Sequence, residues 1–309
     1  MISAKRSLVA LAGVALVLSG AAFVPAGARP AVAAVRFHSH PIAALNANQS
    51  NNWSGYNQGQ IERGNAGFHS VTGDWTVPKA SAHRQFEQEA SSSWIGIGGG
   101  CVDAQCNQTD NTLIQTGTEQ DVVWDPTQTP ATQSQYSAWY ELIPDQATPI
   151  PSSALPVKAG DQFHADIHEN GNGSGKWTIT LSNVTQAKSF SINVNYTSTY
   201  ATAEWIEEAP IVVSVYPPAV GFAPLPDLTP VHFDTATANG SNAALKPSEQ
   251  VQMVDLLTGH VTATPSGVDP DADGFNVCTY STTCAAPTTS SGPVSRSSRT
   301  TRRSGGHRH

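Results

Sequence analysis

Short stretches of alternating or wholly apolar residues run along most of the chain. Each ends at a glycine, proline, asparagine, aspartate or serine, and Val, Ile, Thr and aromatic residues dominate them. No long segment repeats its apolar residues with the period of a helix. The pattern therefore predicts many short strands. The clearest cover residues 71–77, 92–97, 112–117, 136–142, 162–168, 177–181, 190–196 and 231–237.

Strands at this spacing favour an all-β fold, an antiparallel double-sheet sandwich. The strand-rich body runs from residue 51 to 287, and about 240 residues fit one such domain better than two. Residues 209–230 hold six prolines, which predicts an ordered irregular loop rather than a central strand. Residues 288–309 are mainly Ser, Thr, Gly and Arg, so we expect a disordered basic tail.

The N-terminus carries an export pattern. Lys5 and Arg6 precede an apolar run over 8–24, and Ala-x-Ala sites follow it. The run is short for a membrane-spanning helix, which needs about 20 residues. We expect residues 1–34 to be a signal peptide and 35–50 to be a leader or short pro-segment. The mature chain should then be secreted and extracellular, with no membrane attachment.

The charges are unevenly distributed. All 24 acidic residues lie within the body, whereas only seven basic residues share 51–287, so this segment carries 7 − 24 = −17. Such a body repels phosphate backbones, which argues against nucleic-acid binding. An enzyme that works in acid would benefit from having few basic residues, but a generic acidic secreted protein fits the same composition.

The four cysteines form two close pairs. In an exported chain, Cys101 with Cys106 and Cys278 with Cys284 predict two small disulfide loops. Zinc-type Cys-x2-Cys spacing is absent. These pairings leave no cysteine for catalysis, and we expect no metal at the site and no cofactor.

The familiar hydrolase signatures are missing. The chain has no His-Glu-x-x-His, no Gly-x-Ser-x-Gly and no Asp-Thr/Ser-Gly. Residues 269–274 open like a calcium loop, but the twelfth position is Tyr280 rather than Glu. A tight acidic turn is the better interpretation of that segment.

Two stretches offer chemistry that needs no metal, serine or cysteine. Residues 113–117 place Gln115 on a strand, and 203–208 place Glu208 at the end of one. A carboxylate can take a proton from water, and an amide can donate to a developing oxyanion. Strand periodicity puts Glu208 on the same face as Glu204, so it cannot separate these two acids. A polar strand residue and a loop cap are the plain alternatives for Gln115 and Glu208.

Six short motifs then appear in order. They are Trp53-Ser54-Gly55, Gly73-Asp74-Trp75-Thr76-Val77-Pro78, Trp94-Ile95-Gly96-Ile97-Gly98, Leu113-Ile114-Gln115-Thr116-Gly117, Ala138-Trp139-Tyr140-Glu141 and Ala203-Glu204-Trp205-Ile206-Glu207-Glu208. This series resembles the glutamic peptidases, or eqolisins. The resemblance spans most of the body and implies a lectin-like double-sheet sandwich with acid endopeptidase activity.

Matched residue by residue, the resemblance makes Gln115 and Glu208 the catalytic pair and Trp94, Trp139 and Glu141 substrate-binding residues of a groove. It implies an extended polypeptide as the substrate, and we expect the enzyme to be a monomer.

Two positions depart from the fungal pattern, which has Asp where this chain has Gly98 and Glu119. We count Glu119 with the substrate-binding residues. The two departures bear on pH optimum and subsite preference more than on reaction type.

Two rival functions stay open at this point. A retaining glycosidase on a lectin-like fold needs two carboxylates about 5–5.5 Å apart. The string Glu119-Gln120-Asp121 starts the Glu-x-Asp-x-x-Glu pattern of such enzymes, but Trp124 occupies its last position. A non-catalytic sugar-binding module would instead use Trp94 and Trp139 as stacking platforms.

Overall fold

The computed structural model describes residues 35–37, 41–215 and 218–290 of the 309-residue chain. The predicted signal peptide and all but the first residues of the predicted tail lie outside this part. Within it, no helix has the length and apolar character that a membrane span requires.

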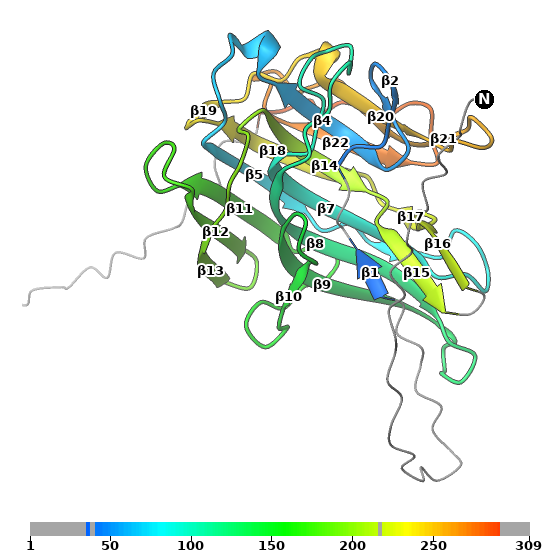
Figure 1. Ribbon diagram of the computed structural model, residues 1–309. Coiled ribbons are helices and arrows are strands. Elements are labelled where there is room, and N and C mark those ends of the chain that lie inside the picture. Colours follow the sequence, from blue (N-terminus) through cyan, green and yellow to red (C-terminus); the bar gives the residue numbers. More distant parts are fainter. Residues whose placement is uncertain (1–34, 38–40, 216–217, 291–309) are drawn as a thin grey trace, which may run out of the picture. The chain divides into compact units, whose positions relative to one another are not determined.

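Two large sheets make up the fold, and each contains strands far apart in the sequence (Figure 1). In sheet 1 the order is β20 (Gln250–Val254), β4 (Trp53–Gly59), β14 (Thr202–Glu208), β7 (Glu89–Gly98), β8 (Leu113–Trp124), β9 (Thr132–Leu142) and β10 (Thr148–Ile150). All these pairs are antiparallel, and the long strands β7, β8 and β9 run side by side.

Sheet 2 packs behind sheet 1. Its order is β13 (Lys188–Asn195), β12 (Lys176–Asn183), β11 (Gln162–Glu169), β5 (Ser70–Thr76), β18 (Val231–Ala238), β22 (Phe275–Thr279), β21 (Val261–Pro265), β20, β3 (Gln49–Ser50) and β2 (Ala44–Asn46). The end of β18 also pairs with β19 (Ser241–Asn242). Only the β3–β20 pair among these described ladders is parallel. Two short 3₁₀ turns complete the elements, at Ile61–Arg63 and Pro247–Glu249.

Strand β20 belongs to both sheets. Its first residues, Gln250 and Val251, pair with β4 of sheet 1, whereas Gln252–Val254 pair with β3 and β21 of sheet 2. The sandwich is therefore nearly closed along this side. The predicted all-β antiparallel sandwich is confirmed, and each of the eight clearest predicted strands overlaps an observed one.

Large aromatic side chains fill the space between the sheets. Trp75 stacks on Phe163 with ring centroids 5.9 Å apart, and Phe233 stacks on Phe275 at 5.0 Å. All four are at most 2% exposed. Burying one such side chain contributes about 1.5–3 kcal/mol, so this cluster is a principal source of the attraction between the sheets.

The two sheets differ in their outward faces. Buried and partly exposed residues alternate along β5 and β11, as expected where one face of a sheet meets water. Strands β4, β7 and β14 are buried at every residue. Sheet 1 is thus covered on both faces at these three strands, where its far face is not an ordinary solvent surface.

The prediction of an irregular loop over 209–230 is wrong, because this segment contains strands. Strands β15 (Ile211–Val215) and β16 (Pro218–Phe222) form a hairpin joined by β1 (Val35–Phe37), and β17 (Asp227–Leu228) pairs with β6 (Ala80–Ser81). The prolines do not prevent this, because Pro210 precedes β15 and Pro218 is the first residue of β16. At strand ends the missing N–H breaks no ladder.

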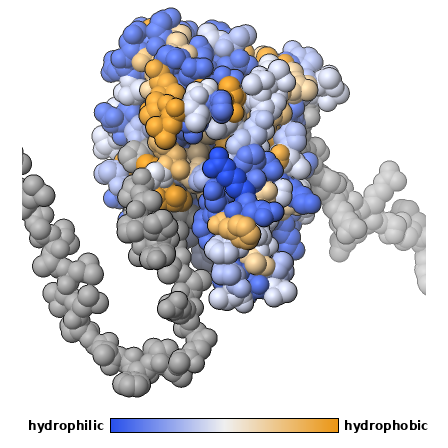
Figure 2. Space-filling model, turned by 90° about the vertical axis from the view of Figure 1, so that its right-hand side faces the viewer, coloured by the Kyte–Doolittle hydropathy of each residue, from blue (hydrophilic) through white to orange (hydrophobic). Residues whose placement is uncertain are grey.

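Both pairs of cysteines are disulfide-bonded, Cys101 to Cys106 and Cys278 to Cys284. The face of the molecule drawn in Figure 2 is mostly hydrophilic, with separate apolar spots. Across the described residues the most exposed large apolar side chain is Leu257, 93% exposed in the turn after β20. Its neighbour Leu256 is 64% exposed, and apolar spots of this small size are normal on a protein surface.

Candidate active site

Alternate residues of sheet 1 point away from the aromatic core and form a second apolar cluster. Along β7, Ile95 belongs to the aromatic core whereas Trp94 belongs to the second cluster. Along β8, Ile114 belongs to the core and Leu113 to the second cluster. We call this side the far face of sheet 1. The cluster on this side contains the buried residues Trp53, Trp94, Leu113, Trp139, Ile206 and Val251 of sheet 1, together with Ile42 from outside the sheet.

The strand register arranges the far face in three rows that cross β14, β7, β8 and β9. The first row is Glu208, Ser92, Glu119 and Ser137. The second is Ile206, Trp94, Gly117 and Trp139. The third is Glu204, Gly96, Gln115 and Glu141. All six catalytic and substrate-binding residues that the sequence suggested therefore lie on one face of four neighbouring strands.

Two glycines make room for the indole rings of this face. A Cβ atom on Gly117 would come within 2.5 Å of the Cβ of Trp94, and one on Gly96 would come within 2.9 Å of its ring. Any larger residue at these positions would displace Trp94. The spacing of Trp94-Ile95-Gly96 and Gln115-Thr116-Gly117 thus fixes where the central indole can lie.

Hydrogen bonds orient the polar side chains between the rings. Gln115 Nε2 donates to Glu141 at 2.6 Å, and Trp94 Nε1 donates to Glu208 at 2.8 Å. Trp139 Nε1 donates to Ser92 Oγ at 3.1 Å. Glu141 and Glu208 thus each accept a hydrogen bond from an uncharged side chain of the far face.

The carboxyl group of Glu208 has an unusual environment. It is 1% exposed, and burial, followed by the negative charge of Glu141, raises the pKa of Glu208 well above its ordinary value. The hydrogen bond from Trp94 opposes this rise but does not cancel it. Burial of the far face therefore favours the protonated form of Glu208.

The three neighbouring acids of β14 occupy distinct surroundings. Glu207 faces the core, where Ser93 Oγ donates to it at 2.5 Å. Glu204 lies on the far face with Glu208 but at the opposite end of β14, where Asp110 adds to the rise of its pKa caused by burial. Glu208 is the acid adjoining Trp94. The structure thus separates two residues that strand parity alone left equivalent.

The two departures from the fungal pattern have different structural settings. Gly98 has a φ of +98°, and a Cβ there would overlap the carbonyl oxygen of Thr112. The backbone as it runs here therefore excludes Asp at this position. Glu119 keeps a carboxylate in the first row, where it is 7% exposed and accepts a hydrogen bond from Ser137 at 3.2 Å.

Sequence reasoning missed Trp53 as a member of this face. Trp53 pairs directly with Glu208 in the ladder, and its ring meets that of Trp94 edge-on at 5.0 Å. The Trp-Ser-Gly motif was visible, but nothing local shows that β4 lies beside β14.

The far face is covered in this structure. Ile42 and Ala44 from the predicted leader pack against its cluster, as do Ile143 and Ala147 from the loop before β10. Gln115 is 0% exposed. Among the described residues, the one group of three potential metal ligands lies elsewhere and includes no member of the three rows. The arrangement offers an acid, an amide and aromatic walls.

Comparison with known proteins gives a consistent result. The model of the Peptidase A4 family matches residues 51–280. Aspergillopepsin-2 of Aspergillus niger is 28% identical over an alignment length of 274, and the match covers 79% of this chain and 88% of that protein.

Two solved structures of scytalido-glutamic peptidase, each with a transition state analog, share 18% identity with the chain. They superpose with TM-scores of 0.53 and 0.51, and in each case the match covers 74% of this chain and 98% of the other. At this level of identity the likeness concerns the fold.

Proposed function

The chain belongs to the peptidase A4 family and is a glutamic endopeptidase; from that premise we propose that Gln115 and Glu208 carry out the hydrolysis. The supporting observation is that both lie on the far face of sheet 1 with Trp94 between them. A peptide bond above Trp94 would have an acid on one side and an amide on the other.

The proposed reaction is attack of water on the scissile carbonyl. Glu208, ionised, takes a proton from the water, and the Gln115 amide donates to the oxyanion that forms. Glu208 then gives the proton to the leaving amine as the C–N bond breaks. A general base contributes about 10²–10⁴-fold and an oxyanion donor about 10²–10³-fold to such a reaction.

Glu141 has a positioning role in this scheme. Its carboxylate accepts from Gln115 Nε2 at 2.6 Å, which fixes the plane of the amide. An amide nitrogen carries two hydrogens, so an amide held in this way can present a hydrogen to the oxyanion. Trp94 and Trp139 would flank an extended substrate, with Glu119 and Glu141 at the edges of the groove.

The covered state explains how such an enzyme could be held inactive. A protonated Glu208 cannot take a proton from water. Uncovering the far face would return water to this carboxyl group and lower its pKa towards the ordinary range. Because Ile42 and Ala44 pack on the far-face cluster, we assign residues 35–50 as a pro-segment whose release opens the site, following a signal peptide that directs secretion.

A substrate and inhibitor assay tests the proposal. The purified mature chain should cleave casein and leave β-glucan intact at pH 3–5. Cleavage at 25 °C should persist in the presence of pepstatin, EDTA and reagents directed at serine or cysteine. Inhibition by pepstatin, or release of sugar from β-glucan, would contradict the proposed chemistry.

A further inference from the structure

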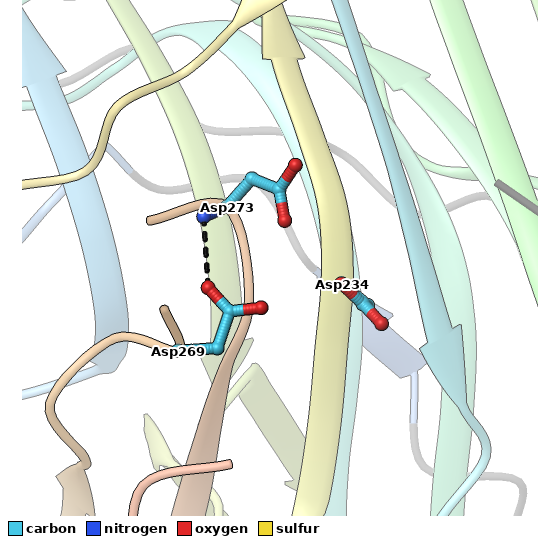
Figure 3. A group of neighbouring side chains, drawn as sticks. All are labelled: Asp234, Asp269 and Asp273. Atoms are coloured by element: carbon cyan, nitrogen blue, oxygen red, sulfur yellow. Dashed lines mark hydrogen bonds between the residues drawn. The ribbon is translucent and has the colours of Figure 1, made fainter. Parts of the chain in front are cut away.

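Three aspartates that play no part in the proposed hydrolysis meet beside β18 of sheet 2. Asp234 comes from β18, and Asp269 and Asp273 come from the turn before β22 (Figure 3). One carboxylate oxygen of each lies within 4.8 Å of those of the other two. Asp234 and Asp269 are only 6% and 5% exposed.

The hydrogen bonds of this cluster leave charge uncompensated. Asp269 Oδ1 accepts from the backbone N–H groups of Asp273 and Gly274, each at 3.1 Å, but its buried Oδ2 has no hydrogen-bond donor. Asp273 Oδ2 accepts from Asn242 at 2.9 Å, while its Oδ1 is likewise buried without a donor. Buried carboxylate oxygens of this kind are costly unless a donor or cation meets them.

Asp269 Oδ2 is directed towards the other acids. A Cβ on Gly274 would lie 2.8 Å from this oxygen and 3.0 Å from Asp234 Oδ1, so both atoms converge on the same small space. The imidazole of His232 lies beside the cluster, with its Nε2 3.6 Å from Asp234 Oδ2. Only a glycine at position 274 leaves this space open.

We propose that Asp234, Asp269 and Asp273 bind a calcium ion. The donors are all oxygens, which suits a hard cation. Calcium–oxygen distances of 2.3–2.6 Å allow two ligands of one ion to be up to about 5 Å apart, and the three oxygens lie within that limit. Magnesium, at 2.0–2.1 Å, requires a tighter cage and should bind more weakly.

The ion would join two parts of sheet 2 that are distant in the sequence. The turn already contacts β18 through a hydrogen bond from Ala236 N to Asp273 O of 3.0 Å. The register of β18 against β5 shifts just after Asp234, so the ladder is interrupted at this point. A bound cation would hold the turn against the interrupted strand and stabilise the fold without touching the far face of sheet 1.

Calorimetry and thermal melting of the purified chain at pH 7, after removal of metal by EDTA, test this site. Titration with CaCl₂ should show one bound ion. At a concentration of about 100 times Kd, calcium should raise Tm by about 5–10 °C, and MgCl₂ should give a smaller rise. Casein cleavage at 25 °C should be the same with and without calcium, which separates this site from the proposed hydrolysis.

Matched variants identify the ligands. Asp269→Asn and Asp234→Asn should each abolish most of the calcium-dependent rise in Tm, and without calcium Asp269→Asn should melt no lower than the parent because repulsion is relieved. Asp145→Asn, an exposed acid elsewhere, should respond to calcium like the parent. A parent chain whose Tm does not respond to calcium would overturn the proposal, as would an undiminished response in both ligand variants.

Discussion

The two faces of sheet 1 are both buried and both carry acids, yet they are built differently. On the core face, Glu207 is surrounded by the space between the sheets, and serine hydroxyls are its donors. On the far face, Glu208 lies among indole rings with Glu141 and Gln115 nearby. These acids are consecutive in the sequence, and only the alternation of strand side chains separates them.

The difference shows what converts a buried acid into a candidate catalyst. The core face packs against sheet 2, so no substrate can reach Glu207. The far face is covered by short segments, including Ile42 and Ile143, which are not part of the sheet itself. A register slip of one residue in β14 would exchange the two environments.

The largest expected effect on the cleavage rate comes from replacing one glutamate on each face of sheet 1 with glutamine. Glu208→Gln should lower casein cleavage by at least about 10²–10⁴-fold, because the amide cannot accept a proton from water. Glu207→Gln, the matched change on the core face, should retain most activity per folded molecule. The measurement is the rate of casein cleavage by the purified mature variants in mild acid. If Glu208→Gln were active and Glu204→Gln inactive, the general base would be Glu204 rather than Glu208.

Strand β8 allows the far face and the core face of sheet 1 to be compared through two glutamines. Gln115 lies on the far face, whereas Gln120 lies on the core face and donates to Thr118. Gln115→Ala should lower kcat by about 10²–10³-fold through loss of the oxyanion donor. Gln120→Ala should instead lower thermal stability and leave kcat of the folded enzyme near that of the parent. Near-native kcat in Gln115→Ala would remove Gln115 from the mechanism.

Glu207 should affect the pH dependence of folding stability rather than the rate of cleavage. Burial raises the pKa of Glu207 to about 7, from the ordinary 4.5 of a glutamate, so the folded state binds more protons than the unfolded state between these values. Stability must then fall as pH rises from 4.5 to 7, by up to about 3 kcal/mol. Glu207→Gln should flatten this part of the profile in urea unfolding at pH 5 and pH 8. An unchanged slope would mean that Glu207 is ionised at both pH values.

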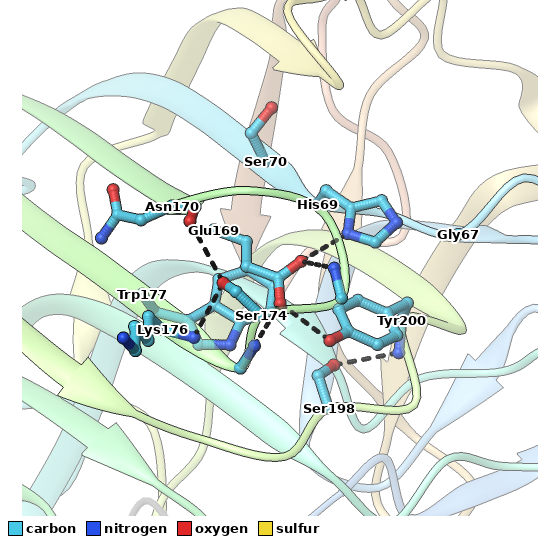
Figure 4. Close-up of polar contacts among 12 residues, drawn as sticks. Gly67, His69, Ser70, Glu169, Asn170, Ser174, Lys176, Trp177, Ser198 and Tyr200 are labelled. Atoms are coloured by element: carbon cyan, nitrogen blue, oxygen red, sulfur yellow. Dashed lines mark hydrogen bonds and ion pairs between the residues drawn. The ribbon is translucent and has the colours of Figure 1, made fainter.

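On sheet 2 the pKa of Glu169 is shifted in the opposite direction to that of Glu207 (Figure 4). Burial of its carboxylate is outweighed by donors that include Gly175, Gly173 and Tyr200, and the pKa falls to about 2 from 4.5. The ionised carboxylate of Glu169 therefore stabilises the fold fully above pH 4.5, and this stabilisation is lost as the pH falls towards 2. Glu169→Gln should therefore cost roughly 2 kcal/mol at pH 6 and much less at pH 2. An equal loss at both values would contradict this assignment.

Much of the fold could be predicted because strand signals are local. Val, Ile, Thr and aromatic runs between turn residues gave the strands and the sandwich class, and parity placed Gln115 and Glu208 on definite faces. The order of strands could not be obtained in this way, since ladders such as β4–β14 join remote segments. Trp53 was missed for that reason.

Other failures have equally specific causes. The prolines of 209–230 suggested a loop, but those at strand ends are compatible with the hairpin β15–β16. The segment 269–274 is a turn, as the sequence suggested, but nothing in the sequence indicates that Asp234 approaches it from β18. The catalytic roles of Gln115 and Glu208 remain predictions until the variants are measured.

The position of β4 imposes an order of events on the making of this enzyme. β4 opens the body, yet its two ladder partners, β14 and β20, come late in the chain. Closing such long loops is entropically costly, and folds dominated by distant pairings form slowly. While β14 and β20 are still unmade, Trp53 has no Glu208 to pair with. A growing chain therefore cannot assemble the far face of sheet 1 until both of these strands have been made.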